Sequence, residues 1–309
     1  MSREQQEVLR FAPSPNGRLH LGHAFSALTG ERLARARGAR YLLRIEDIDR
    51  GRCRPDLERE LIGDLAWLGI EWDGEIRRQS EHFGDYERAL QRLRAQNLVY
   101  PCFATRGEIL DAIAETGIGL ERWPRDPDGA PVYPGLYRGL PARQLKALLL
   151  EERSFAWRLD MAKAKAEAER IAGGPICFAE EGQGPAGETG EQTIKPELFG
   201  DVVLARKDVP TSYHLAVTVD DALQGVTLVT RGRDLFPATH VHRLLQVLLG
   251  LPAPRYHHHG LIRDAEGRKL SKSMTSKSLR DYRDEGMGPD DIKRLIGLPP
   301  EPAAASGRI

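Results

Sequence analysis

Two histidines near the amino terminus are spaced so that both can act on one ligand. His20 and His23 lie in the stretch RFAPSPNGRLHLGH (residues 10–23), where an apolar segment changes into a loop rich in Pro and Gly and then into a segment of helical composition. Residues three apart on a helix return to nearly the same face. A helix N-terminus also offers unpaired N–H groups and the positive end of a dipole, so this junction suits a triphosphate. On its own the pair is equally compatible with core or surface histidines.

A second basic element lies far along the chain. The segment KLSKS (residues 269–273) places Lys269 and Lys272 beside serines, just after Gly267. Ammonium groups on a short flexible loop can close over phosphates and stabilise the charge that develops during phosphoryl transfer. KLSKS alone could be a solvated basic loop, so the two elements together carry the prediction of a phosphate site.

The elements that must position these residues alternate between strands and helices. We expect strands at residues 7–12, 201–206, 212–219 and 226–230, and helices at residues 24–36, 56–68, 80–98 and 239–249. Gly38, Gly69 and Gly250 are the expected helix stops. Such an order predicts an α/β fold with a doubly wound, Rossmann-like parallel sheet, in which Glu46 would face the ligand crevice at the carboxyl edge.

The composition limits the class of protein. Lys+Arg and Asp+Glu both number 45, so the formal net charge is zero and any contact with RNA must come from local patches. The N-terminal residues MSREQQEVLRF lack the apolar core of a signal peptide, and no stretch reaches the roughly 18 apolar residues of a membrane span. Three cysteines, Cys53, Cys102 and Cys177, fit a reducing compartment. We therefore expect a cytoplasmic protein.

HLGH and KLSKS resemble the two signature motifs of class I aminoacyl-tRNA synthetases, and RFAPSPNGRLHLGH in full is similar to the glutamate branch of that class. The similarity continues through RIEDID (44–49), WLGIEWDG (67–74), YHLAVTVDD (213–221), GVTLVTRGRDL (225–235) and LLGLPAPRYHHHGLI (248–262). The resemblance implies a class I catalytic core and an ATP-dependent ligase.

The resemblance also implies a site for L-glutamate. Its residues would be Arg10, Phe11, Ala12, Pro13, Ser14, Glu46, Tyr213 and Arg231. The charges agree with this ligand, because glutamate has two carboxylates and one ammonium, which two arginines and one glutamate can match. The planar fork of Arg suits a carboxylate particularly well.

The implied chemistry is attack of the glutamate α-carboxylate on the α-phosphate of ATP, which gives glutamyl-adenylate and pyrophosphate. His20, His23 and Lys272 would be the catalytic residues that stabilise developing charge. ATP would be bound by His20, His23, Lys269 and Lys272, with Mg²⁺ on its phosphates.

Relatives of this kind insert an acceptor-binding module between the two halves of the catalytic sheet. We expect the first half with HLGH at residues 1–103, the inserted module at 104–195, the second half at 196–255, and the KLSKS loop with a short helical region at 256–309. The module is expected to be the least regular region, with helices at 141–150 and 161–171 and a Gly-rich flexible loop or linker at 174–190.

Many relatives hold a zinc ion in this module through Cys-x-Cys and a later Tyr-x-x-x-Cys. Here Cys102 is followed by Ala104, and Tyr133 is followed by Tyr137 where the last cysteine would stand. Structural zinc takes about four Cys or His ligands. We therefore expect no bound zinc, and we expect residues 257–259 (HHH) to form a hydrated surface strand rather than a substitute metal site.

The acceptor is predicted from the shortness of the segment after KLSKS. Residues 274–309 are too few for the long helical region of a full glutamyl-tRNA synthetase, so we expect a helix pair at 279–297 and no anticodon-binding domain. This architecture resembles the glutamyl-Q tRNA(Asp) synthetase family, which glutamylates the queuosine base at the wobble position of tRNA(Asp). The implied partners are L-glutamate, ATP and the queuosine-bearing anticodon loop, with no membrane and a monomeric enzyme. The alternatives are a compact glutamyl-tRNA synthetase that charges a 3′ end and a non-catalytic synthetase paralogue.

Overall fold

The computed structural model describes residues 6–151, 153–262 and 277–298. The chain divides into two compact units. The first unit comprises Met1–Arg78, Thr227–Arg233 and His257–Ile309, and the second comprises Gln79–Val226 and Asp234–Tyr256. Within the described residues, no helix combines the length and the apolar character needed to cross a membrane.

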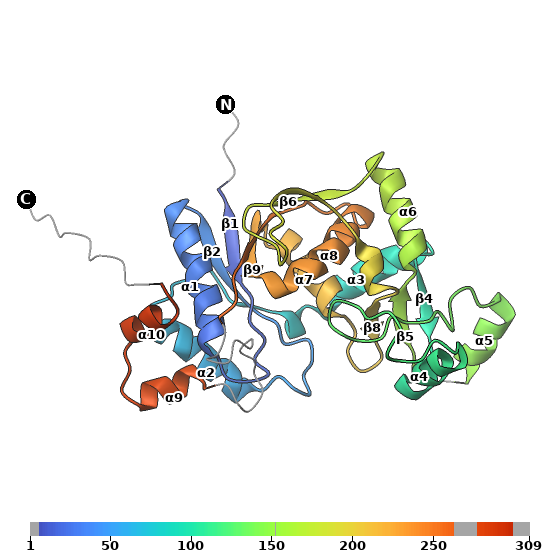
Figure 1. Ribbon diagram of the computed structural model, residues 1–309, viewed down its shortest axis with the longest axis horizontal. Coiled ribbons are helices and arrows are strands. Elements are labelled where there is room, and N and C mark those ends of the chain that lie inside the picture. Colours follow the sequence, from blue (N-terminus) through green and yellow to red (C-terminus); the bar gives the residue numbers. More distant parts are fainter. Residues whose placement is uncertain (1–5, 152, 263–276, 299–309) are drawn as a thin grey trace, which may run out of the picture. The chain divides into compact units, whose positions relative to one another are not determined.

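The first unit is built on parallel strands. Its elements are β1 (Val8–Phe11), α1 (Leu21–Ala36), β2 (Arg40–Ile45), α2 (Pro55–Trp67), β3 (Arg77–Arg78), β9 (Leu228–Gly232), α9 (Leu279–Asp284) and α10 (Pro289–Leu295). β1 pairs in parallel with β2, and β2 in parallel with β3. β9 lies beside β1, because the Thr227 amide donates to the Val8 carbonyl at 2.9 Å. Figure 1 shows α1 running along this strand group, with α2, α9 and α10 near its lower end.

The core of the first unit follows from the apolar pattern of these elements. All four residues of β1 are buried, as are five of the six in β2. Leu9, Leu28, Leu43, Leu65 and Ile292 belong to one core cluster, which draws on strands, α1, α2 and α10. Gly30 on α1 permits close packing, since a Cβ there would lie 2.8 Å from both the Thr230 and the Tyr41 hydroxyl oxygens. The predicted stops of α1 and α2 are confirmed by the positive φ of Gly38 and Gly69, at 61° and 81°.

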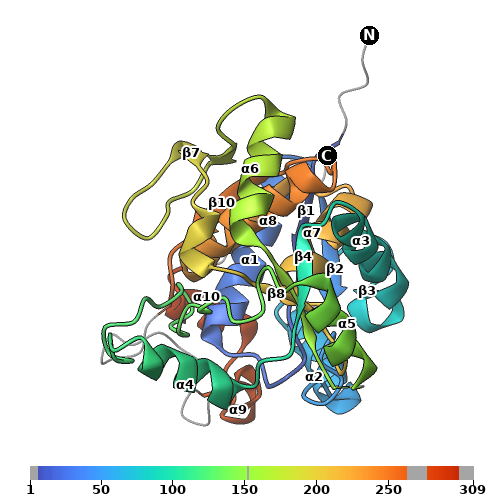
Figure 2. The same cartoon turned by 90° about the vertical axis from the view of Figure 1, so that its right-hand side faces the viewer.

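The second unit contains an antiparallel sheet and several helices. Its elements are η1 (Gln79–Glu81), α3 (Phe83–Ala95), β4 (Val99–Cys102), α4 (Arg106–Glu115), α5 (Ala142–Leu150), β5 (Ala156–Leu159), α6 (Met161–Ala172), β6 (Cys177–Glu180), β7 (Gly190–Thr193), η2 (Pro196–Phe199), β8 (Val203–Arg206), α7 (Tyr213–Leu223) and α8 (Phe236–Leu248). The turn η3 (Arg233–Leu235) and the strand β10 (Arg255–His259) carry residues of both units. Figure 2 shows α4 and α5 in the lower part of the view, below α6 of the same unit.

The α/β class with parallel pairing is confirmed, since β10 also pairs in parallel with β6. One part of the prediction is wrong. The strand expected at 201–206 exists as β8, but it joins β4 and β5 in an antiparallel sheet. The doubly wound arrangement of the two halves stays a prediction.

Three further expectations are corrected within the second unit. Residues 212–219 form the start of helix α7, not a strand. Residues 174–190 are not a linker, because they contain β6, which pairs with β7 in a hairpin. Residues 106–115 form α4, which the pattern did not reveal although Thr105 and Glu108 make a capping box.

Candidate active site

Most of the first-unit residues that were predicted to bind L-glutamate lie where β1 and β2 end. Arg10 and Phe11 close β1, residues 12–14 follow it, and Glu46 comes directly after β2. Because β1 and β2 are parallel, their carboxyl ends lie at the same edge. The Glu46 amide donates to the Pro13 carbonyl at 2.9 Å, so the loop after β1 and the end of β2 are in direct contact.

Both candidate arginines are buried and held in place. Arg10 is 4% exposed, and its Nη1 donates to the carbonyl of Thr230 at 3.1 Å. Arg231 is also 4% exposed, and its Nε donates to Nε2 of His258 at 3.1 Å. Thr230 and Arg231 are neighbours in β9, so the Arg10 guanidinium is hydrogen-bonded to the strand that carries Arg231. Such buried cations provide a strong local preference for a carboxylate ligand.

Glu46 is anchored from two directions. Its Oε1 accepts a hydrogen bond from Nη2 of the fully buried Arg44 at 3.1 Å. The Cys53 thiol lies 3.9 Å from the Glu46 carbonyl oxygen and 3.6 Å from the Ser14 hydroxyl. Arg44 and Cys53 were not among the predicted site residues. Their only signal in the sequence was that Arg44 begins the motif RIEDID and that Cys53 follows it by four residues.

The HLGH motif opens helix α1 as predicted. His20 is the N-cap residue, its Nδ1 accepts from the Gly22 amide at 3.1 Å, and the Nδ1 of His23 accepts from the His20 amide at 3.2 Å. A neutral imidazole that accepts at Nδ1 carries its proton on Nε2. Both rings, whose centroids are 3.9 Å apart, are therefore set as Nε2–H donors at a helix N-terminus.

The glycine in HLGH is required by the position of the first histidine. A Cβ on Gly22 would lie 2.9 Å from Cε1 and 3.1 Å from Nδ1 of His20. Real Cβ atoms do not approach other atoms to 2.9 Å, so a larger residue must displace the ring.

The second motif, with Lys269 and Lys272, lies outside the described residues. The chain that leaves it is described, and Ser278 forms an antiparallel bridge with His20. The Leu279 amide donates to the Leu19 carbonyl at 2.8 Å, and Ser278 caps helix α9. The structure thus joins the chain just after KLSKS directly to HLGH.

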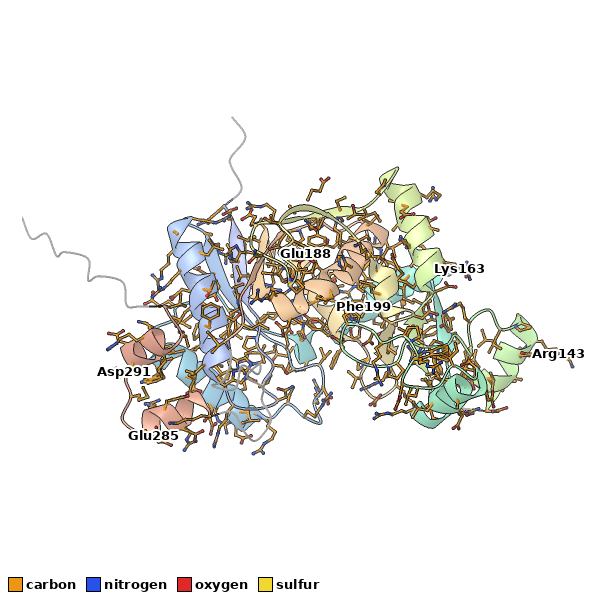
Figure 3. All side chains as sticks on the ribbon, viewed as in Figure 1. Arg143, Lys163, Glu188, Phe199, Glu285 and Asp291 are labelled. Carbon is orange, nitrogen blue, oxygen red and sulfur yellow. The ribbon has the colours of Figure 1, made fainter. Side chains whose placement is uncertain are left out.

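Tyr213 belongs to the second unit, in which Ser212 caps α7 and Tyr213 is its first residue. The Tyr213 ring packs edge-on against His242, with centroids 5.4 Å apart, and His242 shares a 3.2 Å hydrogen bond with His214. Phe199 on η2, labelled in Figure 3, packs edge-on against His214. The strand predicted here is wrong because α7 is buried on most sides, so neither a helical nor an alternating apolar pattern was visible.

The residues that stand at the zinc positions of relatives do not fit a zinc site. The buried Cys102 thiol donates to the Tyr133 hydroxyl at 3.3 Å, and that hydroxyl accepts from the Tyr137 amide at 2.9 Å. Burial, together with the bond from Cys102, raises the pKa of the Tyr133 hydroxyl. Among the residues that the structure describes, no cluster of three or more His, Cys, Asp or Glu could hold a metal. The absence of zinc stays a prediction, to be measured.

The prediction that residues 257–259 form a hydrated surface strand is wrong about their exposure to solvent. They do form a strand, β10, but His258 and His259 are buried, at 1% and 8% exposure. His259 shares a 3.0 Å hydrogen bond with the Ser26 hydroxyl of α1. His258 was missed as a site residue because alternation on a strand predicts which residues share a face, but not which face is covered.

Comparison with known proteins agrees with this geometry. The family model "tRNA synthetases class I (E and Q), catalytic domain" matches residues 7–299. A glutamyl-Q tRNA(Asp) synthetase from Rhodobacter capsulatus is 49% identical over 295 residues, which is 94% of this chain and 100% of the relative. The glutamate–tRNA ligase of Aquifex aeolicus is 36% identical over 94% of this chain but 58% of the relative.

A solved structure shows the same fold. The glutamate-tRNA synthetase of Elizabethkingia anophelis matches with a TM-score of 0.74 at 26% identity, over 95% of this chain. This chain spans 61% of the length of that synthetase. With a family model that matches most of the chain and a relative 49% identical over its whole length, the chain belongs to the glutamyl-Q tRNA(Asp) synthetases, within the class I synthetases for Glu and Gln.

Proposed function

We propose that this chain activates L-glutamate with ATP and transfers the glutamyl group to the queuosine base at the wobble position of tRNA(Asp). The observation that carries the proposal is the 49% identity with a curated glutamyl-Q tRNA(Asp) synthetase along that protein's entire length. The enzyme is then a class I ligase that forms glutamyl-adenylate as its intermediate.

The glutamate site is the edge formed by β1, β2 and β9. Arg10 and Arg231 provide two buried guanidinium groups, and Glu46 provides the carboxylate for the ammonium group of the substrate. Phe11, Ala12 and Pro13 supply backbone and apolar surface around the ligand, and Ser14 supplies a hydroxyl. Tyr213, which the family resemblance also assigns to glutamate, would supply a second hydroxyl.

Activation is an in-line displacement at the α-phosphorus of ATP. The α-carboxylate of glutamate forms the new P–O bond, the α–β phosphoanhydride bond breaks, and pyrophosphate leaves with the electron pair of that bond. Mg²⁺ bound to ATP would neutralise part of the phosphate charge. His20 and His23 donate Nε2–H groups to the phosphates, and Lys269 and Lys272 add positive charge over them. No covalent bond to a side chain is needed.

Transfer completes the reaction. A hydroxyl of the cyclopentene diol of queuosine attacks the glutamyl carbonyl, so that a new ester C–O bond forms and the carbonyl C–O bond to the AMP phosphate breaks. AMP leaves with that electron pair, and the hydroxyl proton passes to solvent. We also propose that the chain divides into four parts, with boundaries at residues 103/104, 195/196 and 255/256. The protein would be monomeric and located in the cytoplasm. The inserted module at 104–195 would then contact the RNA.

A second candidate function, charging of a tRNA 3′ end, is favoured by the 36% identity with the Aquifex glutamate–tRNA ligase. A non-catalytic paralogue is the third candidate.

The first experiment is pyrophosphate exchange into ATP without tRNA, with glutamate, glutamine and aspartate compared at equal concentration. We expect exchange with glutamate and at least about 100-fold less with glutamine, since a neutral amide pairs less strongly with a buried guanidinium than a carboxylate does. No exchange with any amino acid would favour the non-catalytic paralogue.

A further inference from the structure

One buried contact of the first unit ties a histidine to a substrate arginine. The Nε of Arg231 donates to Nε2 of His258 at 3.1 Å, and the two side chains are 4% and 1% exposed. Arg231 lies on β9 and His258 on β10, so the contact joins two strands rather than neighbours in sequence. A buried hydrogen bond to a charged group is stronger than an ordinary one.

The contact fixes the protonation state of the histidine. An arginine Nε only donates, so His258 Nε2 must accept and cannot carry a proton. His258 is therefore a neutral imidazole whose proton lies on Nδ1. If His258 were a charged imidazolium, its Nε2–H would point at the Nε–H of Arg231, and two positive charges would lie side by side in a buried site.

The contact also restricts how Arg231 can bind a carboxylate. A guanidinium can present two edges for a paired hydrogen bond, one made of Nε and one Nη, the other made of both Nη atoms. Since Nε donates to His258, a carboxylate on Arg231 must use the edge formed by the two Nη atoms. The histidine thereby sets the rotation of the guanidinium plane.

We propose that His258 is a positioning residue for glutamate, which acts by holding Arg231 with its Nη edge toward a substrate carboxylate. This inference rests on the proposed function of Arg231. It assigns to His258 an effect on glutamate affinity and none on ATP affinity. The simplest competing account is a core histidine that only stabilises the fold.

Two amides of different length distinguish these accounts. The side-chain oxygen of Gln can take the place of Nε2 and accept from Arg231, whereas the shorter Asn reaches only the position of Nδ1. We therefore expect His258→Asn to raise the KM for glutamate in pyrophosphate exchange at least about 10-fold, with the KM for ATP changed less than about twofold. We expect His258→Gln to stay within about threefold of the wild type.

Controls separate affinity from folding. His259→Gln alters the next buried histidine, whose ring bonds to Ser26 instead of Arg231, so its KM for glutamate should be unchanged. In an Arg231→Ala background, His258→Asn should add nothing to the KM, because the group that it positions is gone. Thermal melting of each variant reports the loss of stability independently of substrate.

The possible results distinguish a failure of the His258 inference from a failure of the proposed function. If the wild type shows no glutamate-dependent exchange, the proposed function fails. If the wild type is active but Asn and Gln have equal KM values, or if the KM for ATP rises with that for glutamate, His258 has only a structural role. Should His258→Asn not fold, calorimetric titration of glutamate into His258→Gln, expected within threefold of the wild type, still tests the inference, and a larger loss overturns it.

Discussion

Arg44 and Glu46 form an ion pair between two residues of one strand end, with the Arg44 guanidinium 0% exposed and its Nη2 at 3.1 Å from Glu46 Oε1. The buried guanidinium holds the carboxylate at the edge where β1 and β2 end. A buried pair contributes less net stability than its geometry suggests, but removing one partner is costly because the other charge stays buried. With the proposed role of Glu46 in binding glutamate, this pair predicts that one substitution affects both substrate binding and folding.

Glu46→Gln should affect both properties. We expect the KM for glutamate to rise at least about 30-fold, or about 2 kcal/mol, because an amide cannot pair with the substrate ammonium group. The free energy of unfolding should fall by about 1–3 kcal/mol, because Arg44 loses its countercharge. Pyrophosphate exchange and urea unfolding measure the two effects.

The matched control is Glu167→Gln, which removes a carboxylate from the exposed pair with Arg170 on α6. It should leave both the unfolding free energy and pyrophosphate exchange nearly unchanged, because an exposed ion pair contributes little to stability. An unaltered KM for glutamate in the folded Glu46→Gln variant would remove Glu46 from the site.

Gly22→Ala should impair catalysis without unfolding the protein. The added methyl group would lie 2.9 Å from His20 Cε1, so the ring must leave the position in which it caps α1. We expect kcat for pyrophosphate exchange to fall about 10-fold to 100-fold, because a misplaced donor no longer meets the developing charge.

Gly63→Ala on α2 is the control, since a Cβ there meets nothing within 4 Å. It should stabilise the protein by about 0.5–1 kcal/mol. Full activity of Gly22→Ala would show that the position of His20 is unimportant.

Asp64 makes the stability depend on pH. The residue is 8% exposed on α2, and burial followed by the charge of Glu60 raises its pKa from 3.8 to about 6. The folded state thus binds this proton more tightly than the unfolded state does, so the stabilisation is complete below pH 4 and is lost as pH rises to 6.

Asp64→Asn should therefore be more stable than the wild type at pH 7.5, by about 1–3 kcal/mol, with the difference shrinking toward pH 4. Urea unfolding at pH 4.5, 6 and 7.5 measures it. Asp56→Asn, at an exposed position of the same helix, should not show this gain. A difference between Asp64→Asn and the wild type that does not change with pH would contradict the assignment.

Zinc content tests the interpretation of the inserted module. Cys102 and Tyr133 hydrogen-bond to each other, and Ala104 stands where a second thiolate would be needed. Elemental analysis should therefore find well under one zinc per chain, and a chelator should leave the melting temperature unchanged. Stoichiometric zinc would show that residues outside these positions form a site.

Much of the first unit could be predicted from sequence because its signals are local. The apolar run of β1, the Pro and Gly residues after it, and Gly38 and Gly69 each specify a strand, a loop or a helix end without reference to distant residues. HLGH was placed correctly at the start of α1 for the same reason.

The failures share a physical cause, which is burial that depends on distant elements. α7 begins with YHLAVTV, which contains two Val, one Thr and one Tyr, and it is covered on most sides, so its composition favoured a strand. The glycines of residues 174–190 suggested a linker, yet β6 is held by its pairing with β7 and β10. His258 was missed because its hydrogen bond with Arg231 joins residues that are 27 positions apart in the sequence.

The measurement that tests the central claim most directly is glutamylation of isolated RNA stem-loops. The acceptors are the anticodon stem-loop of tRNA(Asp) with queuosine, the same stem-loop with guanosine, and an acceptor-stem minihelix of tRNA(Glu), each with radiolabelled glutamate and ATP. We expect label only on the queuosine stem-loop, weakening with salt because phosphate contacts bind the RNA. Periodate oxidation of the diol beforehand should abolish it. Efficient labelling of the tRNA(Glu) minihelix, with none on the queuosine stem-loop, would contradict the account and establish a glutamyl-tRNA synthetase instead.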